Sequence, residues 1–118
     1  QMFKILADDA EKQNFRPLRK AIKYIKENYD KQITAETLAE VVNLSPVYFS
    51  HLFKKQTGKN MTDYITEYRM EIAKKMLFDT DKTIFEIAVA VGFQDQRYFS
   101  KRFKQIVGKT PSEYRKLK

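Results

Sequence analysis

Basic and hydrogen-bonding side chains recur at the same spacing in two stretches of the chain. The first reads VYFSHLFKKQTGK over residues 47–59, and the second reads RYFSKRFKQIVGK over residues 97–109. Lysine and arginine neutralise phosphate groups, while serine, glutamine and arginine donate hydrogen bonds to the edges of nucleic-acid bases. Residues 45–59 hold three lysines and no acid, and residues 94–109 hold two arginines, three lysines and one aspartate. The two stretches therefore carry most of the net charge of +8.

The sequence offers no metal-ligand set and no activated nucleophile. The chain has no cysteine and a single histidine, His51. This excludes disulfides and thiolate zinc sites, and it leaves no second imidazole for a metal site. The sequence also has no phosphate-binding glycine loop and no dinucleotide fingerprint. We therefore expect no catalytic residue, no metal and no cofactor, and an enzyme is the least favoured class.

The apolar residues argue against a membrane protein. They make up 42% of the 118 residues, which is enough for a helical core. No apolar run approaches the roughly 18 to 20 residues that a membrane span needs. No positively charged stretch leads into an apolar segment at the N-terminus, so we expect a cytoplasmic protein. The start at Gln1-Met2 indicates a piece of a longer protein with an upstream domain missing.

The two basic stretches belong to a longer internal repeat. Residues 48–64 align with residues 98–114 at an offset of 50, with 8 identities in 17 positions. Just upstream the offset is 49, so the second copy has one extra residue in the turn before its basic helix. The solvent face of a merely structural helix has little reason to repeat its charge. The duplication therefore favours nucleic-acid binding over an ordinary amphipathic helix.

Proline and capping residues predict where the helices begin. Ser45 and Thr110 are N-cap residues, each followed by a proline at the first helical position. Pro17 is predicted to open a helix in the same way, and the segments TIFE and TPSE have the pattern of a capping box. The full pattern predicts no strand and about seven helices, near residues 17–29, 35–42, 46–57, 61–78, 84–91, 95–107 and 111–116.

Glycine and asparagine predict where helices and turns need a left-handed residue. Gly58 and Gly108 each follow a basic stretch and are placed to end its helix. Gly92 occupies the turn before the second basic helix, where the first copy has Asn43. Each copy is thus predicted to have a short helix, a turn and a basic helix. In a helix-turn-helix of this layout, the second helix enters the major groove of DNA.

These elements predict an all-α fold with two helix-turn-helix subdomains joined by a long connecting helix. The expected organisation is a linker or frayed helix from a missing upstream domain over 1–16, a first subdomain over 17–60, a connecting helix over 61–78 and a second subdomain over 79–118. A connector of this length spans about 27 Å. Successive major-groove faces lie about 34 Å apart, so the two basic helices could occupy adjacent grooves. Tandem copies predict an asymmetric site of two boxes.

Each basic helix is expected to divide into a buried face and an exposed face. The inward residues are predicted to be Phe49, Leu52, Phe53 and Gln56 in the first copy and Phe99, Phe103 and Ile106 in the second. The outward residues are Val47, Ser50, His51 and Lys54, and then Arg97, Ser100, Lys101 and Lys104. Four tyrosines could stack on bases, but their places at helix starts and ends favour core packing: Tyr48, Tyr64, Tyr98 and Tyr114.

Three segments resemble the DNA-binding domain of the AraC/XylS family of bacterial transcription regulators. They read ITAETLAEVVNLSPVYFSHLFKKQTGK, MTDYITEYRMEIAKKML and TIFEIAVAVGFQDQRYFSKRFKQIVGKTPSEYRK, and the resemblance covers residues 18–117. It implies two helix-turn-helix subdomains that insert recognition helices into adjacent major grooves of double-stranded DNA. It also implies an activator that contacts RNA polymerase, and a separate sensing, dimerisation or receiver domain through which the protein oligomerises.

The resemblance also assigns roles to individual residues. The base-reading positions it implies are Pro46, Val47, Ser50, His51, Gln96, Arg97, Ser100 and Lys101. We expect phosphate contacts from Lys54, Lys55, Lys59, Lys104 and Lys109, which position the protein without specifying sequence. Arg97 and Lys101 can donate to guanine, and the first helix is poorer in long donors, so the second is expected to carry more specificity. Arg69, in the connector, is interpreted as structural.

Two other binding functions are compatible with two basic faces. A helical binder of RNA or single strands needs aromatic residues on exposed faces, whereas the sequence pattern assigns these aromatics to buried faces. A protein-interaction module would use its basic faces to bind an acidic partner. Competition by duplex DNA at moderate salt would separate that module from a DNA-binding protein.

Overall fold

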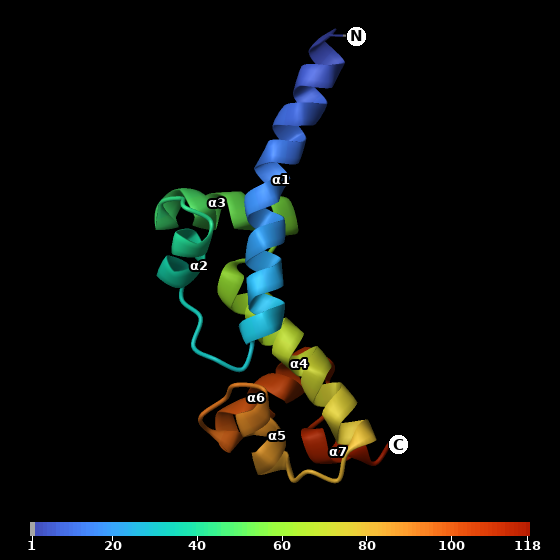
Figure 1. Cartoon of the computed structure of the whole chain (residues 1–118). Helices are drawn as coiled ribbons and strands as arrows, with labels where there is room; N and C mark the ends of the chain where they lie inside the picture. The colour runs from blue at the N-terminus through green and yellow to red at the C-terminus, as the bar shows by residue number, and fades with distance from the viewer. Residues whose placement is uncertain (1) are drawn as a thin grey trace. The chain divides into compact units, whose positions relative to one another are not determined.

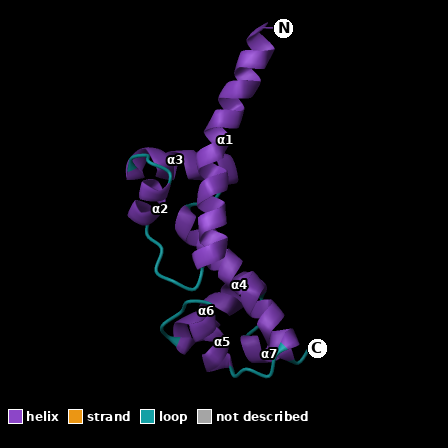
Figure 2. Cartoon of the chain, in the orientation of Figure 1, coloured by secondary structure: helices purple, strands orange, loops and turns teal. Residues whose placement is uncertain are grey.

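The computed structural model describes residues 2–118, with side chains from residue 15 onward, and the described chain consists of helices joined by turns and loops (Figures 1 and 2). Over these residues the elements are α1 (Met2–Asn28), α2 (Ala35–Val41), α3 (Pro46–Thr57), α4 (Met61–Asp79), α5 (Ile84–Ala90), α6 (Gln96–Val107) and α7 (Pro111–Arg115). No strand occurs within residues 2–118. The predicted all-α fold is confirmed, and apart from the start of α1 the helix bounds agree to within one residue.

Helix α1 begins well before its predicted start. The sequence pattern placed Pro17 at the first helical position, whereas Pro17 lies inside α1. Proline removes an N–H donor and disfavours helix at the preceding residue, which is why a boundary was expected there. The stretch before it contains no glycine and several strong helix formers, so local propensity favours a helix on both sides. The assignment of residues 1–16 to a linker or frayed helix stays a prediction, and residue 1 is outside the described residues.

The chain divides into two compact units. Unit 1 comprises Gln1–Asn28 and Ile33–Met61, and unit 2 comprises Tyr29–Gln32 and Thr62–Lys118. Almost all of α4 therefore groups with α5, α6 and α7. The short segment Tyr29–Gln32, which follows α1 in sequence, also belongs to unit 2.

The core of unit 1 is formed by three helices that contact one another, α1, α2 and α3. Its fully buried large side chains are Ile25, Leu38, Phe49 and Phe53. The rings of Phe49 and Phe53 meet edge to face, with centroids 5.9 Å apart. Burying a side chain of this size stabilises a fold by about 1.5 to 3 kcal/mol, so these two rings fix which face of α3 is turned inward.

The core of unit 2 repeats this arrangement with more aromatic residues. The buried cluster consists of Met70, Ala73, Leu77, Ile87, Ala88, Val91, Phe93, Phe99 and Phe103. The ring centroids of Phe93 and Phe99 are 5.3 Å apart, and those of Phe99 and Phe103 are 5.9 Å apart. Tyr114 of α7 packs on this cluster, with its ring centroid 5.7 Å from that of Phe103. The two Phe residues of α6 thus hold it as Phe49 and Phe53 hold α3.

Arg69 of α4 ties the segment Tyr29–Gln32 to unit 2. Its Nε donates to the carbonyl oxygen of Tyr29 at 2.7 Å, and its Nη2 donates to that of Lys31 at 2.9 Å. The guanidinium carbon lies 5.5 Å from the ring centroid of Phe93. Gly92 adjoins this contact, because a Cβ there would lie 2.9 Å from the Tyr29 carbonyl oxygen and 3.0 Å from Arg69 Cζ. The structural role predicted for Arg69 is confirmed.

The predicted helix ends are confirmed at the residues that position the basic helices. Ser45 Oγ accepts a hydrogen bond from the Tyr48 N–H at 3.2 Å. Both capping boxes form, with Thr83 N–H donating to Glu86 Oε1 at 2.9 Å and the same arrangement between Thr110 and Glu113. The left-handed residues are those predicted, namely Asn43, Gly58, Gly92 and Gly108.

Candidate nucleic-acid interface

Helix α3 presents its polar side chains because its two phenylalanines are buried. Val47 is 71% exposed, and His51 and Lys54 are also exposed. These residues lie roughly opposite Phe49 and Phe53, since each residue turns the helix by about 100°. Among the other outward residues, Pro46, Lys55 and Lys59 are exposed and Ser50 is half-buried.

Helix α6 presents an equivalent but more polar face. Its N-cap is Asp95, whose Oδ1 accepts the Arg97 N–H at 2.8 Å. The predicted contact residues Gln96, Arg97, Lys101, Lys104 and Lys109 are exposed, and Ser100 is half-buried like its counterpart in α3. Both sets of predicted base-reading residues therefore reach the surface of one helix each. Their individual contacts with bases or phosphates stay predictions.

The predicted inward position of Ile106 is wrong. Its side chain is 37% exposed, although it lies two turns after the buried Phe99. Ile106 is close to the end of α6, and Val107 packs against the core there instead. Helical periodicity alone does not show where the covering elements stop.

The predicted core packing is also wrong for two of the four tyrosines. Tyr48 is 52% exposed and Tyr98 is 55% exposed, at matched positions in the first turns of α3 and α6. The Tyr98 ring still contacts the core, with its centroid 6.0 Å from that of Phe93. Tyr64 and Tyr114 are half-buried, and Tyr114 stacks on Phe78 at 4.9 Å. The first pair lies beside the predicted contact residues, and sequence reasoning missed this placement.

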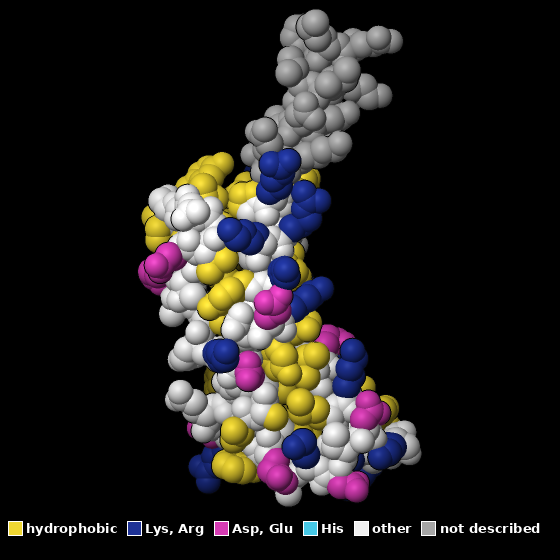
Figure 3. Space-filling view, viewed as in Figure 1, with side chains coloured by type: hydrophobic (Ala, Val, Ile, Leu, Met, Phe, Trp, Pro, Cys, Tyr) yellow, Lys and Arg dark blue, Asp and Glu magenta, His cyan; other side chains and the backbone are white. Residues whose placement is uncertain are grey.

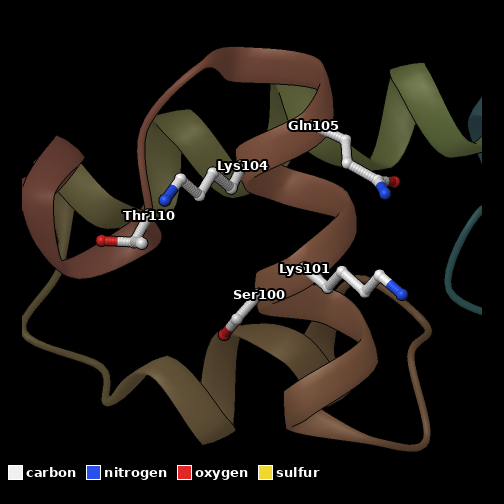
Figure 4. A pocket seen from close by; sticks show the side chains of 5 residues that line it. All are labelled: Ser100, Lys101, Lys104, Gln105 and Thr110. Carbon is white, nitrogen blue, oxygen red and sulfur yellow. The ribbon is translucent and has the colours of Figure 1, made fainter.

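A hollow of about 410 Å³ opens on unit 2 between α6 and the start of α7. It is lined by Ser100, Lys101, Lys104, Gln105 and Thr110. In Figure 4, Lys104 extends from α6 on the side of Thr110, whereas the side chains of Lys101 and Gln105 extend in the opposite direction in this view. Thr110 was predicted only as a cap, and its position in the hollow depends on how α7 folds back toward α6.

The electrostatics of the hollow involve Glu113 as well as the lysines. The hydrogen bonds from Thr110 lower the pKa of Glu113, and the nearby charges of Lys104 and Lys109 lower it further. Thr110 Oγ1 accepts the Glu113 N–H at 3.1 Å, and the Thr110 hydroxyl also hydrogen-bonds the Glu113 carboxylate. The hollow therefore combines the Lys104 cation with the Ser100 hydroxyl, a pair that suits an anionic oxygen.

The charge is not uniform over the surface. On the face shown in Figure 3, lysine and arginine side chains alternate with acidic and apolar ones. No cluster of histidine and acidic residues able to hold a metal ion occurs among the described side chains. Within residues 2–118, none of the helices combines the length and apolar character that a membrane span requires.

Each unit thus contains a helix-turn-helix, formed by α2 and α3 in unit 1 and by α5 and α6 in unit 2. In each pair the two helices contact one another. Each pair is joined by a turn with a left-handed residue, Asn43 or Gly92. The second helix of each pair carries the exposed polar and basic residues. This arrangement defines a tandem helix-turn-helix DNA-binding domain.

Comparison with known proteins agrees with this class. A family model described as a helix-turn-helix domain matches residues 38–117. AdaA of Bacillus subtilis, a bifunctional transcriptional activator and DNA repair enzyme, is 37% identical over 94 residues, which are 80% of this chain and 44% of AdaA. The chain belongs to the AraC-type helix-turn-helix family, as its resemblance to the AraC/XylS regulators predicted. It spans less than half the length of the curated relatives it matches.

Solved structures share the fold over most of the chain. The C-terminal domain of AraT, a response regulator from Geobacillus stearothermophilus, is 38% identical with a TM-score of 0.84, covering 87% of this chain and 86% of that one. The DNA-binding domain of AdpA, a global transcriptional factor solved in complex with a target DNA, is 26% identical with a TM-score of 0.81. That match covers 86% of this chain and 91% of AdpA's domain.

Proposed function

We propose that this chain binds double-stranded DNA sequence-specifically by inserting α3 and α6 into adjacent major grooves. The observation that carries this proposal is the matched burial of Phe49 and Phe53 in α3 and of Phe99 and Phe103 in α6. In both helices this burial leaves the predicted contact residues facing outward. The related AdpA domain, which is bound to a target DNA in its structure, supports DNA binding by this fold.

We propose that α6 reads bases more strongly than α3. Arg97 and Lys101 are exposed and have long side chains that can donate to guanine O6 and N7, and Gln96 can pair with adenine. The exposed Val47 of α3 offers only apolar contact, of the kind made with a thymine methyl group. The remaining proposed base-reading residues are Pro46, Ser50, His51 and Ser100.

The proposed phosphate contacts surround these residues. They are Lys54, Lys55, Lys59, Lys104 and Lys109, and all five side chains are exposed. Such contacts fix register and orientation on the duplex without carrying sequence information. Lys104 also lines the hollow, together with the hydroxyl of Ser100.

The chain's relatives are longer than the chain, so we make a further proposal for the whole protein. It is a bacterial transcription activator that contacts RNA polymerase and oligomerises through another domain. Action on chromosomal DNA implies a cytoplasmic location. Although AdaA is also a repair enzyme, the proposed role of this chain is DNA binding without catalysis.

Selection of binding sites from random duplex DNA tests the proposed function. The 118-residue chain would be used at about 150 mM salt, where non-specific binding is weak, and the winning duplex would be footprinted. We expect an asymmetric site of two short boxes, centred about 10 to 10.5 base pairs apart on one face. A failure to enrich any sequence, with binding lost at that salt, would contradict sequence-specific recognition.

A further inference from the structure

Two tyrosine rings at matched positions are largely exposed and are not among the proposed base-reading residues. Tyr48 and Tyr98 are 52% and 55% exposed, and each is the third residue of its basic helix. An aromatic residue that recurs in both copies of an internal repeat would be expected to pack in the core of each copy. These two are repeated but lie largely in solvent, so the feature they share is their place beside the exposed face of each basic helix.

The helical geometry places each ring on one flank of its helix. Taking the buried Phe49 as the reference direction, Tyr48 is turned by about 100° to one side and Ser50 by about 100° to the other. The same relation holds for Tyr98 and Ser100 around Phe99. Val47 and Arg97 point away from the core, between these flanks. Each helix therefore has a central outward face with a tyrosine flank and a serine flank.

A helix in the major groove presents its two flanks to the two DNA strands. The groove is about 12 Å wide, and a helix with its side chains is about 10 to 12 Å across, so both flanks come close to a sugar–phosphate backbone. In unit 2 the serine flank carries the hollow of Ser100, Lys104 and Thr110. The tyrosine flank faces the opposite strand, where it offers a phenolic O–H and a ring surface.

We infer that Tyr48 and Tyr98 are matched backbone contacts of the two helices, each donating its hydroxyl hydrogen to a phosphate oxygen of duplex DNA. This inference rests on the proposed function. Tyrosine is among the side chains that donate to phosphate oxygens, and an ionised acceptor strengthens the hydrogen bond. Because the contact reaches a phosphate, it adds affinity for every sequence and holds each helix in one register.

Substitution of tyrosine by phenylalanine isolates the hydroxyl group. The variants are Tyr48→Phe and Tyr98→Phe, and the control is Tyr114→Phe, whose ring packs against Phe78 and Phe103 inside unit 2. Dissociation constants would be measured for the selected duplex and for an unrelated duplex over a range of salt concentrations. Thermal unfolding would verify that each variant is folded.

The expected result is a loss of about tenfold in affinity for each of the two variants, the loss typical of one hydrogen bond to a charged group. The loss should be equal on both duplexes, and Tyr114→Phe should bind as the unchanged chain does. The slope of log K against log salt should stay the same, because no cation is removed. Lys104→Ala should instead reduce the magnitude of that slope by about 0.9.

Three results would overturn the inference. Unchanged affinity in both phenylalanine variants would show that the hydroxyls make no contact. A loss confined to the selected duplex would assign the tyrosines to base edges. Tighter binding of the unchanged chain to a single strand of the same sequence, lost in Tyr98→Ala but kept in Tyr98→Phe, would assign them to base stacking. If the unchanged chain bound no duplex at all, the proposed function would fail together with the inference.

Discussion

Lys101 and Lys104 lie about one helical turn apart on α6 and both line the hollow, yet their side chains extend in opposite directions in the view of Figure 4. The Lys104 side chain extends toward Thr110, whereas that of Lys101 extends away from it. Two neighbouring residues of the same type and exposure are thus expected to have different functions. We propose that Lys101 contacts a base edge and that Lys104 contacts a phosphate.

Alanine substitution separates these two functions. Lys101→Ala should weaken binding to the preferred duplex by about 1 to 3 kcal/mol and narrow its advantage over random DNA. Lys104→Ala should weaken binding to all duplexes alike, because phosphates carry no sequence information. Competition binding with preferred and random duplexes measures both effects. An equal loss on every sequence for Lys101→Ala would reassign that residue to a phosphate contact.

Gly92 and Gly58 both have left-handed backbones, but their surroundings differ. At Gly92, with φ of +103°, a Cβ would collide with the Tyr29 carbonyl oxygen and the Arg69 guanidinium. At Gly58, with φ of +79°, nothing lies within 4 Å of a Cβ. Gly58→Ala should therefore cost about 1 kcal/mol from backbone strain alone, and Gly92→Ala should cost more. Urea unfolding measures the difference, and equal losses would show that the contact around Gly92 adjusts freely.

At the scale of the elements, the helix ends are determined locally and the helix faces are not. Both capping boxes and all four left-handed residues could be predicted, because each depends on a few adjacent residues. The exposure of Tyr48, Tyr98 and Ile106 could not, since it depends on which element covers each end of α3 and α6. The position of Thr110 in the hollow and the carbonyl groups that accept from Arg69 could not be predicted either, because they too depend on how separate elements pack together. Sequence periodicity predicted the buried phenylalanines of α3 and α6 correctly, because they lie at the middle of the surface through which each helix packs on its core.

The capping boxes also predict a dependence of stability on pH. Hydrogen bonds from Thr83 lower the pKa of Glu86 below its ordinary value of 4.5, and those from Thr110 do the same for Glu113. A carboxylate with a lower pKa in the folded state stabilises the fold above the unfolded pKa, and this contribution is lost as pH falls through the folded pKa. Glu86→Gln and Glu113→Gln should each reduce the loss of thermal stability between neutral pH and acid. If the unfolding temperatures of both variants changed with pH as that of the unchanged chain does, this linkage would be contradicted.

At the scale of the whole molecule, affinity should depend strongly on salt. If five to seven of the lysine and arginine side chains contact phosphates, log K should fall with log salt at a slope of roughly −4.5 to −6. Titrations of the selected duplex between low and moderate salt measure this slope. A slope near zero would be inconsistent with an interface in which lysines neutralise the DNA backbone.

The assignment of Tyr29–Gln32 to unit 2 affects how the protein can be dissected. Because this segment lies between two parts of unit 1 in sequence, the chain passes between the units three times. A fragment cut at residue 62 would lose the carbonyl groups that accept from Arg69, and Tyr68 would lose the Tyr29 ring, 5.6 Å away between centroids. The second helix-turn-helix therefore depends on a segment that precedes the first one in sequence. A chimera that takes this helix-turn-helix from another family member would also need that member's segment after α1.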